Sequence, residues 1–282
     1  MITVLPIEGE LPHRRSDHAR GSGRAGLSRL ADRALPWLLP LALLLAWLLN
    51  ERLGWLPPQV MPTPSSVVLA SREALASGEL FANLSMTLLW LLEGYVIAAA
   101  LGLTIGIASG LSDKVADYLL PTFKALSYVP VLGWLPLWLV VLGVGDALKV
   151  VLVAQASLSP IVFNAYDGVR GVSPAQVELG RVLRFSRWQQ LTRIVLPAAF
   201  PGIWAGIRFG LTKAWLALVA IELLASTEGL GFMMVNARNL YQLDLMFVSV
   251  ITIGLIGFAL DRLLQAIEDH VLRWRAPEET LS

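Results

Sequence analysis

Six apolar stretches dominate this chain, and their length is the feature that most limits its fold. About 20 apolar residues in a helix cross the roughly 30 Å hydrocarbon core of a bilayer. The charged fraction is 15%, against about 25% in soluble domains, and 56% of the residues are hydrophobic. We therefore expect an all-α integral membrane protein with about six transmembrane helices, over residues 34–49, 85–110, 125–143, 149–166, 198–225 and 245–267.

The composition also excludes several classes of function. A net charge of +1 provides no basic field for nucleic acid, and the absence of Cys excludes disulfides and thiolate chemistry. The three His lie in polar segments near the two ends, so we expect no metal site. The chain has no Gly-x-x-x-x-Gly-Lys-Ser/Thr segment and no Ser/His/Asp arrangement. We therefore expect no catalytic residues and no enzyme activity on this chain.

The distribution of Lys and Arg predicts on which side of the membrane each end lies. With the N-terminus inside, sixteen of the 22 basic residues lie on the cytoplasmic side. Four fall on the opposite side, namely Arg52, Arg72, Lys149 and Arg238. Because cytoplasmic segments of membrane proteins are enriched in basic residues, we expect both tails, 1–33 and 271–282, to be cytoplasmic. The transmembrane domain between them covers residues 34–270.

One loop is too polar to cross lipid but keeps a regular pattern. Residues 167–197 form this cytoplasmic loop, in which Leu179, Val182, Leu183 and Trp188 alternate with basic residues. The pattern predicts a helix with one apolar and one charged face. From periodicity alone, such a helix can lie on anionic lipid headgroups or dock against a partner protein.

The spacing within this loop resembles the EAA loop of permease subunits of ATP-binding-cassette (ABC) importers. That signature reads Glu-Ala-Ala, three residues, Gly, nine residues and Ile-x-Leu-Pro. In this chain Leu and Gly replace the two Ala, and Arg replaces the Gly of the signature. The matching positions are Glu178, Leu179, Gly180, Arg184, Ile194, Leu196 and Pro197.

Further stretches extend the resemblance from about residue 35 to Trp274. They read LPPQVMPTP at 56–64, YVPVLGWLPLWLVVLGVGD at 128–146 and ELLASTEGLGF at 222–232. Their order and separations are most similar to the aliphatic sulfonate permeases, within a branch that also includes taurine and nitrate permeases. The resemblance implies the type I ABC importer permease fold.

The resemblance also implies a function and a set of partners. The chain is expected to form the pathway of an ATP-driven importer in the bacterial inner membrane, with alternating access driven by ATP. Aliphatic sulfonates are the expected substrates, with taurine, nitrate or another small anion as the alternative. The expected partners are ABC ATPase subunits, which carry ATP and Mg, an external solute-binding protein and a second copy of this permease in the lipid bilayer. This chain itself is expected to hold no cofactor. An ion-coupled secondary carrier is the alternative from another class, and it would have no ATPase to dock.

In such importers the EAA loop docks into a groove of the ATPase and passes its motion to the spanning helices. Here Leu183 and Trp188 are expected to fill the groove, while Glu178 and the basic residues fix the register. We expect Pro197 to separate the loop helix from the fifth span. A left-handed turn at Arg184 would cost roughly 1 kcal/mol, so we expect a helical turn there.

Four ionisable residues lie within the spans. A charged side chain is costly inside the bilayer, so each of them is a candidate functional residue. Arg208 can reach the headgroups or form an ion pair, and Glu222 can act as a gate, contact another helix or be exposed at the outer mouth. Arg208, Trp215 and Glu222 recur every seven residues and so share one helix face. The pathway candidates are Glu93, Arg208, Lys213, Trp215 and Glu222.

Lys213 is the sharpest of these candidates because it lies near the middle of its span. Helix rise places it at about the depth of Glu93, and three- and four-residue steps place it on the small-residue face of Gly206 and Gly210. We expect an ion pair between Lys213 and Glu93. The pair can be purely structural, or it can offer a passing anion a weak positive site.

Overall fold

The computed structural model describes residues 24–271, and every regular element in that range is helical. The chain divides into two compact units. The first unit, up to Leu56, contains α1 (Arg24–Leu53). The expected first span, 34–49, lies within α1. The expected tails, 1–33 and 271–282, fall mostly outside the described residues.

The second unit begins at Pro57 and contains the remaining helices. They are α2 (Pro64–Ala76), α3 (Glu79–Leu111), α4 (Asp113–Ser127), the 3-10 turn η1 (Val131–Trp134), α5 (Leu135–Leu142), α6 (Asp146–Arg170), α7 (Pro174–Val182), α8 (Arg187–Gln190), the π-helical segment η2 (Leu191–Val195), α9 (Leu196–Ala225), α10 (Leu230–Asn239) and α11 (Leu243–Val271).

Within the described residues, four helical stretches are long and apolar enough to cross a membrane. They are α3, α6, the stretch Arg187–Asn239 that contains α9, and α11. These stretches confirm the second, fourth, fifth and sixth expected spans. A bent pair, α4 with η1–α5, gives a fifth span when it is counted as one.

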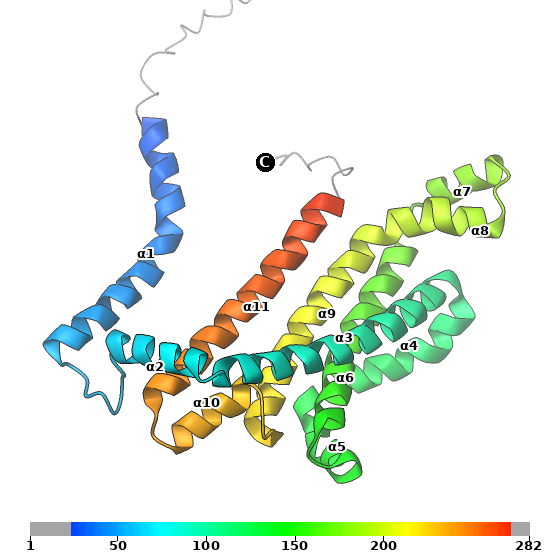
Figure 1. Ribbon diagram of the computed structural model, residues 1–282. Helices are drawn as coiled ribbons and strands as arrows, with labels where there is room; N and C mark the ends of the chain where they lie inside the picture. The colour runs from blue at the N-terminus through cyan, green and yellow to red at the C-terminus, as the bar shows by residue number, and fades with distance from the viewer. Residues whose placement is uncertain (1–23, 272–282) are drawn as a thin grey trace, which may run out of the picture. The chain divides into compact units, whose positions relative to one another are not determined.

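The expected third span, 125–143, is not one continuous helix: its residues fall in the end of α4, in η1 and in α5. The chain bends by 88° between α4 and η1–α5 (Figure 1). Pro130 is the N-cap of η1; it has no amide to bond back into α4, and its ring disfavours a helical conformation at Val129. The apolar composition of 125–143 carried no information about this bend.

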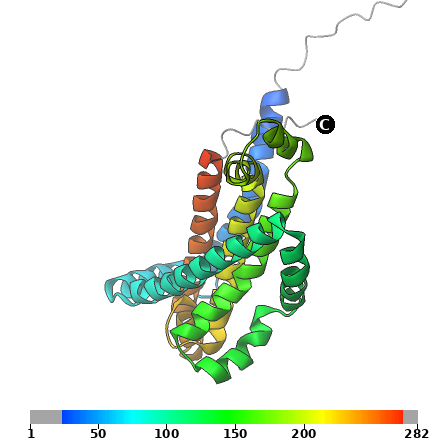
Figure 2. The same cartoon turned by 90° about the vertical axis from the view of Figure 1, so that its right-hand side faces the viewer.

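Small residues allow the long helices to approach closely. A Cβ at Gly102 of α3 would lie 2.8 Å from the side chain of Ile161 on α6, and one at Gly210 of α9 would lie 2.7 Å from the same side chain. Glycine on α3 and on α9 therefore lets both helices approach α6 closely. Figures 1 and 2 show α6 between these two helices, packing along both.

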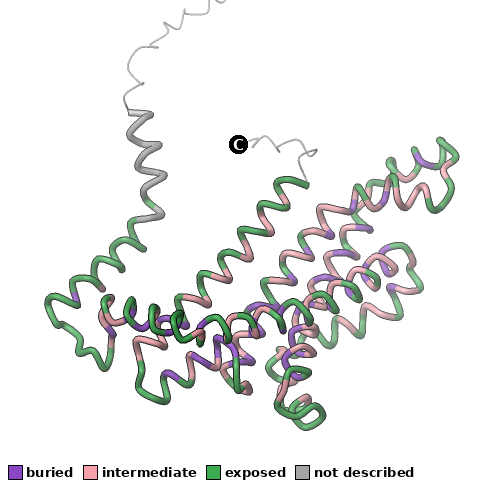
Figure 3. Tube along the Cα trace, viewed as in Figure 1, coloured by how far each residue is buried: buried purple, intermediate pink, exposed green. Residues whose placement is uncertain are grey.

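Burial is concentrated where α3, α6 and α9 meet (Figure 3). The loop helices α7 and α8 lie at one end of α9, and α10 packs at the other end (Figure 1). α10 was not expected from the sequence. It places a short helix between α9 and α11, so the segment after Ala225 is more than a simple connection.

Candidate functional site

The loop at 167–197 folds as a short helical hairpin of α7 and α8. A capping box starts α8: the Ser186 hydroxyl accepts from the Gln189 amide, and the Gln189 side chain accepts from the Ser186 amide. The Gln190 side chain donates across the hairpin to the Val177 carbonyl at 3.0 Å. The hairpin therefore has its own hydrogen bonds and presents a defined surface.

A left-handed turn ends α7 at Arg184, so the expectation of a helical turn is wrong. Arg184 has φ +52°, the Phe185 amide donates to the Gly180 carbonyl at 2.9 Å, and the Arg184 amide donates to the Arg181 carbonyl at 3.0 Å. This pair of bonds is the Schellman motif, which favours glycine at the left-handed position. The left-handed backbone at this turn explains why the EAA signature has glycine here. Arg184 adopts the same conformation at a cost of roughly 1 kcal/mol.

The expected separation at Pro197 is also absent. α8, η2 and α9 follow one another without an interruption. The Leu196 amide donates back five residues to the Leu191 carbonyl, so the turn before Pro197 is wider than an α-turn. Proline is tolerated here because it lies in the first turn of α9 and follows this wider turn. The loop is consequently continuous with the spanning helix.

The residues of the EAA-like motif divide into exposed and packed groups. A Cβ at Gly180 would lie 2.6 Å from Cδ1 of Ile194, so these two motif positions meet inside the hairpin. Leu196 packs against the buried cluster that joins α6 and α9. Glu178 and Pro197 are exposed. Around the turn between α7 and α8, the exposed residues include Leu179, Val182, Leu183, Arg184, Arg187 and Trp188, which we call the loop tip.

The loop tip has an unusual composition for a water-exposed surface. Val182 is 74% exposed and Trp188 is 71% exposed, beside the guanidinium groups of Arg184 and Arg187. Large apolar side chains clustered on a polar surface indicate an interaction site. Leu183 and Trp188 are both on this surface, as the sequence predicted.

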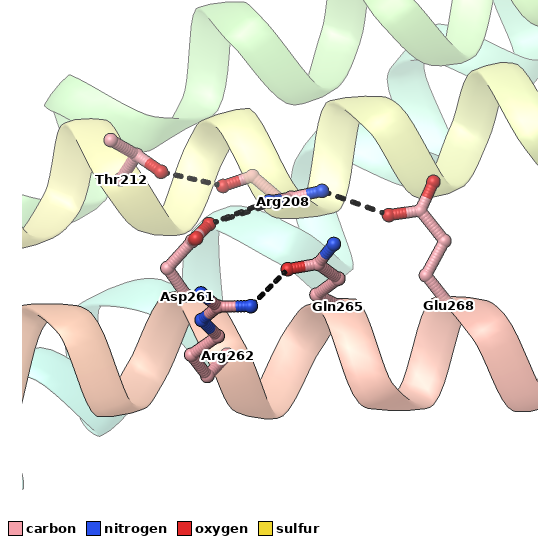
Figure 4. A network of polar contacts seen from close by, with 6 residues as sticks. All are labelled: Arg208, Thr212, Asp261, Arg262, Gln265 and Glu268. Carbon is pink, nitrogen blue, oxygen red and sulfur yellow. Dashed lines mark hydrogen bonds and ion pairs between the residues drawn. The ribbon is translucent and has the colours of Figure 1, made fainter. Parts of the chain in front are cut away.

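Arg208 forms an ion-pair network that ties α9 to α11 (Figure 4). Its Nε and Nη2 donate to Oδ1 of Asp261 at 3.1 and 2.9 Å, and its Nη1 donates to Oε2 of Glu268 at 3.1 Å. Of the two expected alternatives, the ion pair is the one formed. The two carboxylates compensate the charge of Arg208 inside the membrane, and the bonds fix the spacing of the two helices.

Glu222, in the last turn of α9, is packed against the start of α10, with 1% of its surface exposed. Its Oε2 accepts from the Gly231 amide at 2.8 Å, while the Leu230 amide donates to Oγ1 of Thr87 at 2.9 Å. The Gly229 amide donates to Oδ1 of Asn83 at 2.9 Å. Three successive amides at a helix N-terminus are thus capped from α3 and α9, and a carboxylate suits the positive end of the helix dipole. We call this group the α10 cap. The alternative of Glu222 exposed at the outer mouth is wrong, and the helix contact is the arrangement formed.

The α10 cap also explains a positive backbone angle. Gly229 has φ +99°, and a Cβ there would lie 2.6 Å from Cδ of Glu222. Any side chain at this position would therefore be strained and would collide with the carboxylate. Close packing of this kind indicates that the position of α10 is tightly specified.

Lys149 is the functional candidate that the sequence reasoning missed. It was assigned to the outer surface, but its side chain is 2% exposed. Its Nζ lies 3.4 Å from the ring centroid of Trp90 and 3.7 Å from Oδ1 of Asp146. A cation over an indole face is stabilised by the ring quadrupole, more strongly when water is excluded. The sequence does place a Trp in one spanning helix and a Lys at the start of another, and this pair could have suggested the contact.

The ion pair expected between Lys213 and Glu93 is not formed. Both side chains are exposed, and Nζ of Lys213 lies 5.3 Å from the ring centroid of Phe209 on its own helix. The small-residue face of α9 continues through Ala214 and Ala217, which are buried. Because one residue turns a helix by about 100°, Lys213 lies beside that face and not on it.

Trp215 shares the face of Arg208 and Glu222, as its seven-residue spacing predicted. It is buried, and a Cβ at Gly257 of α11 would lie 2.7 Å from its Nε1 atom. These three side chains therefore contact α10 and α11. In this chain they position the neighbouring helices, and their place on the pathway stays a prediction.

Comparison with known proteins agrees with this geometry. Residues 98–273 match the protein family described as binding-protein-dependent transport system inner membrane component. A Bacillus subtilis (strain 168) protein named as an aliphatic sulfonates transport permease protein is 37% identical over 238 residues, covering 84% of this chain and 86% of the relative. The taurine transport system permease protein of Escherichia coli (strain K12) is 31% identical over 263 residues, covering 87% and 96%.

Among solved structures, the crystal structure of an amino acid ABC transporter with histidines shares the fold. The TM-score is 0.57 at 16% sequence identity, and the similarity covers 71% of this chain and 97% of that chain.

Proposed function

This chain belongs to the family of binding-protein-dependent transport system inner membrane components, and on that premise we propose that it is the permease of an ATP-driven importer for aliphatic sulfonates. Members of this family are transport subunits and not enzymes. The proposal places the multi-pass chain in a bacterial inner membrane as a homodimer, with ABC ATPase subunits inside and a solute-binding protein outside. ATP and Mg are then bound by the ATPase subunits. Taurine, nitrate and other small anions are the alternative substrates.

The loop tip is the observation that carries the proposal. Its exposed apolar side chains, led by Trp188, require a partner, and the motif spacing selects an ATPase groove over a lipid surface. An interfacial helix on lipid needs only an amphipathic pattern, whereas this hairpin has a fixed left-handed turn and a capped second helix. An ion-coupled carrier would give the hairpin no protein to bind.

The continuity of α8, η2 and α9 supports the coupling role. A displacement of the loop tip by the ATPase acts directly on α9, because no flexible linker intervenes. α9 in turn holds α11 through Arg208 and α10 through Glu222. The loop can therefore move the spanning helices as a group.

Glu93 and Lys213 remain predicted pathway residues, each on its own. Both are ionisable and exposed on spanning helices, where contact with lipid is costly. In a homodimer these faces can meet the second copy or the water of the pathway. A positive Lys213 beside that water suits an anionic substrate.

The coupling role is tested with Trp188→Ala and Glu178→Ala in the complete transporter. We expect Trp188→Ala to lower copurification of the ATPase at least about tenfold, since removing a central Trp from an interface typically costs 2 kcal/mol or more. Glu178→Ala should lower ATP-dependent uptake while the permease still inserts. Both are measured in proteoliposomes that contain the ATPase and the loaded binding protein.

The control for this experiment is Tyr241→Ala. Tyr241 is 91% exposed, like Trp188, but lies in the connection between α10 and α11. It should leave ATPase binding unchanged. Full ATPase binding and uptake in both loop variants would show that the loop tip is not the docking surface.

The substrate is tested with a panel of anions on the same proteoliposomes. Binding protein loaded with an alkanesulfonate should stimulate ATP hydrolysis more than protein loaded with taurine or nitrate. Stimulation by nitrate or taurine alone would transfer the assignment to that substrate and leave the permease function intact.

A further inference from the structure

The break between α4 and η1 leaves polar backbone unpaired at membrane depth. The Tyr128 and Val129 amides turn back to the Ala125 and Leu126 carbonyls at 3.3 Å each, and Pro130 has no amide. Within the described residues, no hydrogen bond reaches the carbonyls of Ser127, Tyr128 and Val129. Tyr128 is 75% exposed.

The depth of this break follows from its neighbours. Ser127 lies 14 residues after Asp113, the first residue of α4, which corresponds to ~21 Å of helix. A cavity of about 350 Å³ on one side of the break joins Leu126 to Leu158 of α6, and a hollow of about 650 Å³ on the other side joins Tyr128 to Phe163. Leu158 is the middle residue of the 25-residue helix α6, and Phe163 lies between that point and the end of the helix. The break is therefore close to the centre of the membrane.

Lipid cannot cover such a break. Backbone carbonyls without a donor cost several kcal/mol each in hydrocarbon, so irregular backbone at this depth occurs only inside protein or beside water. The described residues leave the break exposed, so burial within this chain does not satisfy it.

The helix face that leads to the break carries ionisable side chains among apolar ones. Asp117, Lys124 and Ser127 of α4 and its C-cap Tyr128 line the larger hollow beside Ala116, Leu120 and Pro121, with Phe163, Tyr166 and Asp167 facing them from α6. Asp117, Lys124 and Tyr128 follow seven- and four-residue steps and so share one face of α4. Ionisable side chains within a span almost always face a water-filled cavity or another protein chain.

These two observations, one of backbone and one of side chains, point to the same surface. We propose that the segment Ser127–Pro130, with the Asp117–Lys124–Tyr128 face of α4, lines the water-filled pathway of the assembled transporter. This inference rests on the proposed function, because the pathway exists only in the assembled permease. Tyr128 then projects into the pathway at mid-depth, where its ring limits the space available to a passing anion.

The test uses the natural absence of Cys. Tyr128→Cys is placed in the full transporter in proteoliposomes and treated with an anionic, sulfonate-bearing methanethiosulfonate, with access from both sides. Only a thiolate reacts, and a thiolate forms only where water is present, so we expect reaction at least about tenfold faster than for Leu255→Cys. Leu255 is 62% exposed on the apolar surface of α11 and is the matched control.

Ser127→Cys is the second variant, in case the loss of the Tyr128 ring impairs assembly. A rate equal to that of Leu255→Cys in both variants, with and without ATP and loaded binding protein, would overturn the proposal. ATP-dependent uptake by each variant before labelling is measured separately. If the variants take up substrate normally but their thiols do not react, only the pathway assignment is refuted. If the thiols react but neither the variants nor the parent chain takes up substrate, the importer function is refuted.

Discussion

Single residues in this protein are explained by contacts that periodicity does not report. The spacing correctly grouped Arg208, Trp215 and Glu222, because a seven-residue step is a property of the helix alone. It could not show that Lys149 turns inward onto Trp90, since that contact joins two helices. It placed Lys213 on the wrong face because a shift of one residue rotates a side chain by about 100°.

At the residue scale, Arg184→Gly should stabilise the loop hairpin. Glycine removes the penalty of the left-handed conformation, roughly 1 kcal/mol, so local opening should become about fivefold rarer. Chymotrypsin cleavage after Phe185 and after Trp188 reports this opening. The matched control is Arg181→Gly in the last turn of α7, which should increase cleavage, since glycine there adds conformational entropy to the opened chain and relieves no left-handed strain. Equal effects of the two substitutions would contradict the Schellman turn.

Also at the residue scale, Glu222→Ala should destabilise the fold by about 1–3 kcal/mol, because the buried Gly231 amide loses its acceptor. Glu222→Gln keeps an oxygen for that amide and should cost less. Thermal unfolding of the purified permease measures both. Glu228→Ala removes an exposed acid nearby and should leave the melting temperature unchanged. A larger loss for Gln than for Ala would contradict the α10 cap.

At the scale of elements, the sequence predicted where the helices lie better than how they are joined. The apolar stretches at 85–110, 149–166, 198–225 and 245–267 became α3, α6, α9 and α11, each extended by a few residues. The joints departed from expectation: a break at Pro130, a π-helical turn before Pro197 and the additional helix α10. Hydropathy averages over about 20 residues, so it cannot resolve a change of direction that depends on one proline or one cap.

The Arg208 network makes a prediction for the α9–α11 joint. Arg208→Met leaves two carboxylates in the membrane without a cation and should at least halve the yield of monodisperse permease. Asp261→Asn should be more damaging than Glu268→Gln, because Asp261 accepts two of the three bonds. Size-exclusion chromatography of the detergent-solubilised protein measures the yield.

The control for this joint is the triple variant Arg208→Met, Asp261→Asn and Glu268→Gln. It removes all three charges together and should recover most of the folded yield. If the triple variant gives a yield of monodisperse permease as low as that of Arg208→Met alone, the unpaired charges are not the reason for the lower yield.

At the scale of the whole molecule, orientation rests on the distribution of basic residues. A Cys at Ser226, between α9 and α10, should react with an impermeant reagent added to intact cells. A Cys at Ser186, between α7 and α8, should react only after permeabilisation. Labelling of Ser186→Cys in intact cells would invert the assigned topology and with it the side on which the ATPase binds.

The uninterrupted helix from the loop hairpin to the α10 cap has a mechanical consequence. α9 has 30 residues, or ~45 Å, so a tilt of about 10° at its loop end displaces the other end by about 8 Å. Because the helix is continuous, a displacement of one end also displaces the other. Force is transmitted through it in both directions, and binding energies coupled in this way are reciprocal. We therefore expect binding of a loaded solute-binding protein at the α10 end to change the position of Trp188 at the opposite end. This change would precede ATP hydrolysis.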